Sequence, residues 1–140
     1  QKYNSYQREL TTQVNQSVGA TLDEVIVNQD VFVGLSDANV LTDSQVRRMA
    51  KKPIIFALAN PVPEISPEEA INAGAAVVAT GSSQWPNQVN NVLVFPGLFK
   101  GLLSSGLKHV DMPLQIRVAH ALADMIENPD ATHVVPGVFW

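Results

Sequence analysis

The stretch that decides the fold is PIIFALANPVPEISPEEA, residues 53–70. Its first part, IIFALAN at 54–60, is an apolar run of strand length, and its unbroken apolar character is typical of a parallel strand that is buried on both faces. A helix is predicted to follow at Ser66, because a capping residue, a proline at the first helical position and an acid at Glu69 occur in the required order. That helix is expected to end at Gly74.

The segments on either side continue this alternation. Residues 31–36 (VFVGLS) and 75–81 (AAVVATG) are predicted to be two further short buried strands. A helix over 43–52, opened by Thr42 and stopped by Pro53, is predicted between the first two strands. Helices alternating with buried strands indicate the α/β class, here part of a doubly wound (Rossmann-type) parallel sheet with flanking helices.

The ends of the chain are predicted to be mainly helical. Two helices are expected near the start, and two more follow a polar, turn-rich segment after the third strand. The last of these helices has an apolar stripe at helical spacing. The predicted segments are helices at 5–15, 21–28 (capped by Thr21 with Glu24), 92–106 and 112–127 (capped by Asp111, with apolar Leu114, Val118, Ala121, Leu122 and Met125), turns at 82–91 and an irregular tail at 128–140.

Composition excludes several classes of protein. The chain has 140 residues, 46% of them hydrophobic and 16% charged, which suits one globular domain with a modest core. A net charge of -4 with no basic stripe argues against nucleic acid as a partner, and no apolar run is long enough to span a membrane. Without cysteine there are no disulfides or thiolate metal sites. A cytoplasmic protein is expected, and the start at Gln1 and apolar end at Trp140 suggest a piece of a longer chain.

A ligand site is predicted at the carboxyl ends of the strands, where open parallel sheets bind their ligands. Gly34 and Gly81 would let a ligand approach the backbone there. The three strand ends are Gly34-Leu35-Ser36-Asp37, Asn60-Pro61-Val62-Pro63-Glu64 and Thr80-Gly81-Ser82-Ser83. Pro61 and Pro63 restrict the backbone after the second strand and hold Asn60 in a set direction.

The fourth element of the predicted site is Asn87-Gln88-Val89-Asn90-Asn91, which ends in a pair of asparagines. Two successive asparagines cannot both cap the same helix, so one amide is expected to be free to bind a small polar acid.

Groups for acid–base or metal chemistry are scarce. Each histidine (His109, His120, His133) is interpreted as structural, and the pairs Asp23-Glu24 and Glu68-Glu69 are explained by helix starts. No spacing indicates a metal site, and the phosphate-binding G-x-G-x-x-G of a dinucleotide fold is absent. The residues therefore predict half of a ligand-binding α/β domain that lines a site without carrying its catalytic groups.

Four stretches together are similar to the bacterial-type malic enzymes, in the same order and with similar spacing. The combination of ALANPVPE with PNQVNNVLVFPG is the specific part, and the resemblance runs from about residue 30 to 139. It implies that 1–140 is the C-terminal half of a malic-enzyme NAD(P)-binding domain, with the phosphate-binding half and the catalytic domain upstream. The stretches are VFVGLSDANVLT, PIIFALANPVPEISPEEA, GAAVVATGSSQWPNQVNNVLVFPGLFKGLL and VVPGVF.

The resemblance implies an oxidoreductase that converts malate to pyruvate and CO₂ with reduction of NAD or NADP. It also implies a divalent metal (Mg or Mn) and a homo-oligomer. The family's catalytic tyrosine and lysine and its metal-binding carboxylates lie upstream, so the chain alone is expected to be inactive. The residues implied are Asn60, Asn90 and Asn91 for malate, and Gly34, Leu35, Ser36, Ala59 and Asn60 for the cofactor.

Two alternatives stay open from the sequence. A non-catalytic binding or regulatory module of malic-enzyme descent would explain why no catalytic groups are found. Another Rossmann-type dehydrogenase would explain the parallel strands but not NPVPE together with NQVNN. Two departures from the family pattern are SDANVL at 36–41, which lacks the usual glycine and weakens the cofactor contact expected there, and Trp85, which replaces a smaller aromatic and is expected to have no consequence.

Overall fold

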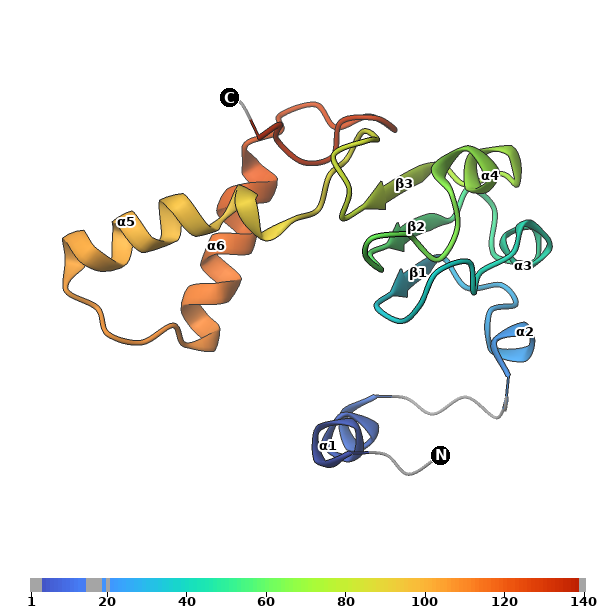
Figure 1. Ribbon diagram of the computed structural model, residues 1–140, viewed down its shortest axis with the longest axis horizontal. Coiled ribbons are helices and arrows are strands. Elements are labelled where there is room, and N and C mark those ends of the chain that lie inside the picture. Colours follow the sequence, from blue (N-terminus) through green and yellow to red (C-terminus); the bar gives the residue numbers. More distant parts are fainter. Residues whose placement is uncertain (1–3, 15–18, 20, 139–140) are drawn as a thin grey trace.

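A parallel sheet of three strands forms the centre of the computed structural model, which describes residues 4–14, 19 and 21–138 (Figure 1). The strand order is β1-β2-β3, and the register aligns Gly34, Ala57 and Thr80 at the carboxyl edge. The predicted α/β class with a parallel sheet is confirmed. The strands are β1 (Val31–Gly34), β2 (Ile54–Ala57) and β3 (Val77–Thr80).

The core lies between one face of the sheet and the short helices that precede and follow β2. Ile55 and Ala57 on β2 are fully buried and cluster with Val46 of α3 (Asp43–Arg47) and Ala70 of α4 (Pro67–Asn72). Alternation along each strand explains why Ile55, Ala57 and Val78 share this face. The cluster is completed by Ile26, Leu41, Met49, Ile65, Ala73 and Ala75.

The opposite face of the sheet is uncovered at β1 by the described residues, but it is half-buried at β2 and buried at Ala79 on β3. Val31 and Val33 are 48% and 59% exposed, so the prediction that the first strand is buried on both faces is wrong for this chain. Two causes act together: β1 is an edge strand, paired only with β2, and no described helix packs on this face of it.

Side-chain caps fix the helix starts where the sequence predicts them. The backbone N–H of Gln45 donates to Thr42 Oγ1 at 3.3 Å, and that of Glu69 donates to Ser66 Oγ at 3.2 Å. Helix α3 ends at Arg47 rather than at residue 52, because the chain turns at Arg48 and Lys52 adopts a positive φ of 57°.

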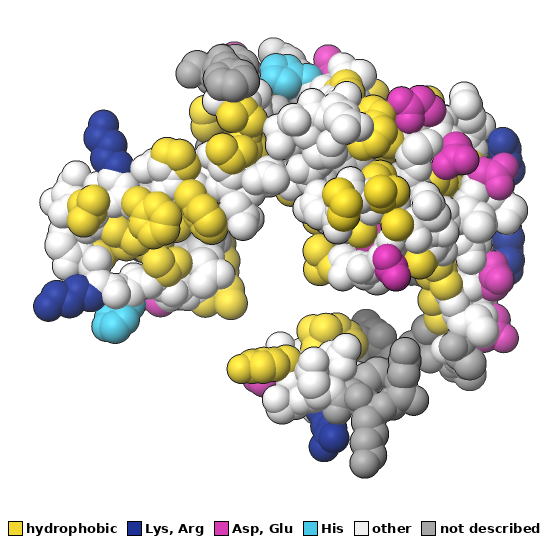
Figure 2. All heavy atoms as spheres, viewed as in Figure 1, with side chains coloured by type: hydrophobic (Ala, Val, Ile, Leu, Met, Phe, Trp, Pro, Cys, Tyr) yellow, Lys and Arg dark blue, Asp and Glu magenta, His cyan; other side chains and the backbone are white. Residues whose placement is uncertain are grey.

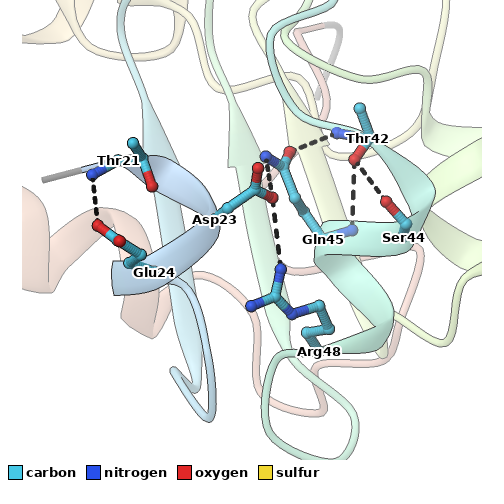
Figure 3. Close-up of polar contacts among 7 residues, drawn as sticks. All are labelled: Thr21, Asp23, Glu24, Thr42, Ser44, Gln45 and Arg48. Atoms are coloured by element: carbon cyan, nitrogen blue, oxygen red, sulfur yellow. Dashed lines mark hydrogen bonds and ion pairs between the residues drawn. The ribbon is translucent and has the colours of Figure 1, made fainter. Parts of the chain in front are cut away.

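A polar cluster joins α2 (Leu22–Val25) to α3 (Figure 3). Gln45 donates from Nε2 to Asp23 Oδ1 at 3.0 Å, and Arg48 lies 3.4 Å from the same oxygen. Glu24 closes the predicted capping box by accepting from the backbone N–H of Thr21 at 3.1 Å. The helix is shorter than the predicted span of 21–28, because residues 26–28 form a turn that ends at Asn28 with a φ of 59°.

The C-terminal part forms a helical hairpin beside the sheet, while α1 (Ser5–Gln13) stands apart from both (Figure 1). Apolar side chains gather over this hairpin, as Figure 2 shows, and they line a groove of about 400 Å³ between α5 and α6. The predicted stripe of the last helix is confirmed, since all five of its residues line this groove. No helix of the described ranges is long and apolar enough to cross a membrane. The elements here are η1 (Asn91–Leu93), α5 (Phe95–Ser105) and α6 (Met112–Asp124).

Candidate functional site

The carboxyl edge of the sheet brings the predicted strand-end residues together. Because the strands are parallel and in register, the segments after Gly34, Ala57 and Thr80 leave the same edge. Leu35 follows β1 with 79% of its surface exposed, and Ser36 beside it is also exposed. This edge is where an open α/β sheet of this kind binds its ligands.

Asn60 and Asn90 converge on Gly81 just beyond β3. A Cβ atom placed on Gly81 would lie 2.8 Å from Asn60 Nδ2, so the Asn60 side chain packs directly against this glycine. Asn90 Nδ2 donates to the Gly81 carbonyl at 3.1 Å. Two amides from segments 30 residues apart in sequence therefore lie against one strand end.

One asparagine of the pair caps a helix and the other does not, as the sequence predicts. Asn90 caps η1, with its Oδ1 accepting from the Val92 backbone N–H at 3.1 Å. Asn91 is the first residue of η1, is exposed, and has no side-chain hydrogen bond with another described residue. Asn60 is likewise exposed and has none among the described residues. Asn60 and Asn91 therefore carry uncommitted amides, and Asn90 retains one amide hydrogen.

Glu64 is the last residue of the predicted strand-end segment 60–64, but sequence reasoning missed its role. Its side chain is fully buried at 0% exposure and joins two strand ends. Its Oε1 accepts from the backbone N–H of Ser36 at 2.9 Å, and its Oε2 accepts from that of Ala59 at 3.0 Å. The only sign of this role in the sequence was a glutamate close to two prolines. The inward orientation of its side chain depends on Ser36, which lies 28 residues away in sequence.

The structure explains the two glycines at this edge differently from the prediction. They were expected to leave room for a ligand against the backbone. Instead, a Cβ on Gly34 would lie 2.4 Å from Glu64 Cδ, and a Cβ on Gly81 would meet Asn60. Side chains of the chain itself fill both spaces, so these glycines make room for Glu64 and Asn60.

Asn87, which belongs to the fourth element of the predicted site, attaches the C-terminal tail to β3, a structural role that the sequence did not predict. It is only 6% exposed, and its Nδ2 donates to the carbonyls of Val78 at 3.1 Å and Ala131 at 2.8 Å. Its Oδ1 accepts from the Val134 N–H at 2.9 Å, and its φ is 56°, a conformation that asparagine tolerates better than most residues. The predicted turn after β3 thus contains a buried anchor for the tail, and the residue two positions on lies beside the strand because the Val89 N–H donates to the Thr80 carbonyl at 2.8 Å.

Trp85, the larger aromatic noted in the sequence, has a hydrogen-bond partner. Its indole Nε1 donates to Glu68 Oε1 at 2.8 Å. The backbone N–H of Glu68 and then this indole lower the pKa of the Glu68 carboxyl, because both stabilise its charged form. The contact joins the start of α4 to the turn after β3.

Metal-ligating groups are not assembled in this part of the chain. Within the described residues, no three His, Cys, Asp or Glu side chains are placed to hold a metal ion. His109 and His120 are exposed on the hairpin. Asp130 is occupied in the tail, where the backbone N–H and then the hydroxyl of Thr132 lower the pKa of its carboxyl. The donor set does not fit a divalent cation.

The chain was compared with known protein families, curated proteins and solved structures. Residues 1–138 match the family model described as "Malic enzyme, NAD binding domain". The chain is 50% identical over 121 residues to the bifunctional malic/malolactic enzyme of Bacillus subtilis, covering 85% of this chain and 30% of that protein. It is 39% identical over 139 residues to the NAD-dependent malic enzyme of Geobacillus stearothermophilus, covering 97% of this chain and 29% of that protein.

A solved structure agrees with the sequence matches. The crystal structure of the NAD-dependent malic enzyme from Thermotoga maritima superposes with a TM-score of 0.89 at 42% identity, covering 97% of this chain and 36% of that one. An NADP-dependent malic enzyme of Halomonas elongata is 44% identical over 110 residues, covering 78% of this chain and 26% of that protein. The chain spans about 30% of the length of the curated relatives from Bacillus subtilis and Geobacillus stearothermophilus.

Proposed function

This chain belongs to the malic enzyme family, where it matches the NAD-binding domain, and from that premise we propose that it forms the substrate and nicotinamide side of an active site. The full-length protein would convert malate to pyruvate and CO₂ with reduction of NAD or NADP. Residues 1–140 would be the C-terminal half of the NAD(P)-binding domain. The alternative of another Rossmann-type dehydrogenase loses its support, because the family model covers residues 1–138.

The observation that carries the proposal is the pair of uncommitted amides at one sheet edge. Asn60 and Asn91 are exposed, and neither side chain has a hydrogen-bond partner among the described residues. Neutral amides can donate to a carboxylate and accept from a hydroxyl, which are the two groups that malate presents. We propose that Asn60 and Asn91 contact malate directly, and that Asn90 holds the start of η1 and offers its remaining amide hydrogen.

The cofactor would lie along the end of β1. The exposed Leu35 side chain offers an apolar surface for a flat ring, and the Ser36 hydroxyl offers a polar contact beside it. The backbone N–H groups of Ser36 and Ala59 are already bound to Glu64, so ligand contacts from Ala59 would come through its carbonyl. When bound, the nicotinamide supplies the hydride acceptor, and the role of this chain is to orient the substrate C2–H toward it.

The remaining parts of the reaction would be supplied from outside this chain. The described residues hold no donor set for a divalent metal, so ligands for Mg or Mn would come from elsewhere in the full-length protein. The same holds for the acid–base groups. We also propose that the full-length enzyme is a cytoplasmic homo-oligomer.

The test is a spectrophotometric assay of the full-length protein with malate and Mn²⁺, at 340 nm, with NAD and NADP in parallel. Reduction with either cofactor is expected, and the isolated 140 residues serve as the inactive control. Lactate is measured alongside pyruvate, because hydride returned to the product would escape detection at 340 nm. A folded full-length protein that makes neither product would contradict the proposal and favour a non-catalytic module.

Asn60→Ala tests the site assignment in the same protein. Loss of one hydrogen bond to a charged ligand should lower kcat/KM for malate by about 10- to 100-fold. Asn128→Ala is the matched control, because Asn128 is also an exposed asparagine that precedes a proline, but it lies in the segment after α6. Equal kinetics of the two variants would remove Asn60 from the site.

A further inference from the structure

Glu64 is a buried carboxylate for which the proposed function has no use. It is 0% exposed, no positively charged side chain contacts it among the described residues, and both of its oxygens accept from backbone N–H groups. Burying a charge is costly unless hydrogen bonds compensate, and a purely structural turn could be closed by a neutral side chain. The role of Glu64 must therefore be inferred from the residues that it connects.

Glu64 connects the ends of two strands at the point where their regular pairing stops. Among the described residues, the last ladder bond runs from the Leu58 N–H to the Gly34 carbonyl at 3.1 Å. The next backbone bonds between the two segments come only further on, where Asn39 donates to the Pro63 carbonyl and Leu41 donates to the Glu64 carbonyl. One residue beyond Leu58, Glu64 Oε2 holds Ala59 and Glu64 Oε1 holds Ser36. The carboxylate thus continues the pairing of β1 and β2 past the point where the sheet stops.

The contact with Ala59 also closes the loop that carries Asn60. Residues 60–63 lie between the two groups joined by this 3.0 Å bond, and Asn60 directly follows the residue that the bond holds. Asn60 then packs against Gly81 at the end of β3. A chain of contacts from Ser36 through Glu64 and Ala59 to Asn60 and Gly81 spans the carboxyl edge.

Gly34 leaves the space that the Glu64 carboxylate occupies. Any Cβ at Gly34 would come within 2.4 Å of Glu64 Cδ and 2.5 Å of its Oε1, distances that real Cβ atoms do not show. The φ of Gly34 is not in the left-handed region, so backbone conformation does not require glycine here. Glycine is required here because the Glu64 carboxylate fills the space that a Cβ would take.

We propose that Glu64 is a positioning residue that acts through Asn60, setting where this amide meets the substrate relative to the cofactor side at Ser36. The inference rests on the proposed function. Glu64→Gln is the sharpest perturbation, because it keeps the shape but turns one acceptor oxygen into an amide NH₂ that faces a backbone N–H. One of the two strand ends must then be released.

The test is a double-mutant cycle of Glu64→Gln with Asn60→Ala in the full-length protein, measured as kcat/KM for malate. Alone, Glu64→Gln should lower kcat/KM by about 10- to 100-fold, as expected for one lost charge-assisted hydrogen bond. In the Asn60→Ala background the same change should lower it less than about threefold, because coupled residues are not additive. Glu127→Gln, an exposed glutamate after α6, is the control for the change of charge.

Each outcome decides a different point. A wild-type protein without malate-dependent activity overturns the proposed function and this inference with it. An active wild type in which the two losses multiply overturns the positioning role alone, because a general loss of stability would act equally in both backgrounds. The thermal unfolding of all four proteins is measured alongside the kinetics. If Glu64→Gln does not fold, Glu64→Asp is used instead, because aspartate keeps the charge on a shorter side chain. Full activity of Glu64→Asp would also overturn the inference, because a shorter side chain cannot hold both strand ends.

Discussion

Gly81→Ala should separate activity from stability at the carboxyl edge. The added Cβ would lie 2.8 Å from Asn60 Nδ2 and 3.1 Å from its Oδ1, whereas ordinary van der Waals contact begins at 3.4 Å. The Asn60 amide must therefore retreat by about 0.6 Å or change rotamer. It can do so easily, because Asn60 is exposed and has no hydrogen-bond partner among the described residues that would resist.

The substitution should consequently lower activity more than stability. A misplacement of about 1 Å in a positioning group can cost about 100-fold, so we expect kcat/KM for malate to fall by about 10- to 100-fold in the full-length protein. The free energy of unfolding should change by less than about 1 kcal/mol, since Gly81 does not have a positive φ and alanine reduces the freedom of the unfolded chain.

The assay is malate-dependent reduction of NAD(P) combined with urea denaturation. Gly101→Ala is the control, because a Cβ there meets nothing within 4 Å and lies in the middle of α5. That variant should keep full activity and gain up to about 1 kcal/mol, as alanine is the better helix former. If Gly81→Ala is folded and keeps wild-type kinetics, the contact between Asn60 and Gly81 does not belong to the active site.

Two further predictions concern the turn after β3. Asn87→Ala should lower the free energy of unfolding by about 2–4 kcal/mol, since three hydrogen bonds are lost at about 1 kcal/mol each and alanine is strained at a φ of 56°. Asn87→Gly should be milder but still destabilising in urea, and wild-type stability of this variant would mean that the hydrogen bonds contribute nothing. Trp85→Phe should raise the pKa of Glu68 part of the way to its ordinary value, with the backbone N–H still holding it down. Because a lowered pKa means that the charged form is favoured in the fold, the indole contact stabilises at neutral pH and is lost as the pH falls through that pKa; an unchanged NMR titration would contradict the role of the indole.

Local sequence patterns predicted the elements because their causes are local. The capping residues Thr42, Ser66 and Asp111 each accept from a backbone N–H three residues on, so the helix starts could be placed from short motifs. Helix ends were less predictable. Helix α3 stops at Arg47 although the sequence up to Lys52 suits a helix, since the turn that follows is fixed by backbone bonds from Asn28 and Ala50 that join distant segments.

The site was predicted in its location but not in its construction. The carboxyl edge follows from the parallel strands, and the asparagines there were identified as candidates from their positions after strands and at a helix start. The roles of Glu64 and Asn87 could not be found, because each depends on partners 28 to 47 residues away. The glycines were assigned to a ligand because nothing in the sequence shows which side chain fills the space beside them.

The inward position of Glu64 has an electrostatic consequence for the edge. A dianionic acid such as malate is repelled by carboxylates at short range, and two of them occur in the segments that follow β1 and β2, Asp37 and Glu64. Glu64 is fully buried with both oxygens bound to backbone N–H groups, and Asp37 accepts from the N–H of Ala38 at 2.8 Å in its own turn. The groups left uncommitted at the end of β2 and at the start of η1 are the neutral amides of Asn60 and Asn91. The same carboxylate that joins the strand ends is thereby turned away from the surface where an anion would bind, so the edge gains rigidity without presenting that charge to its ligand.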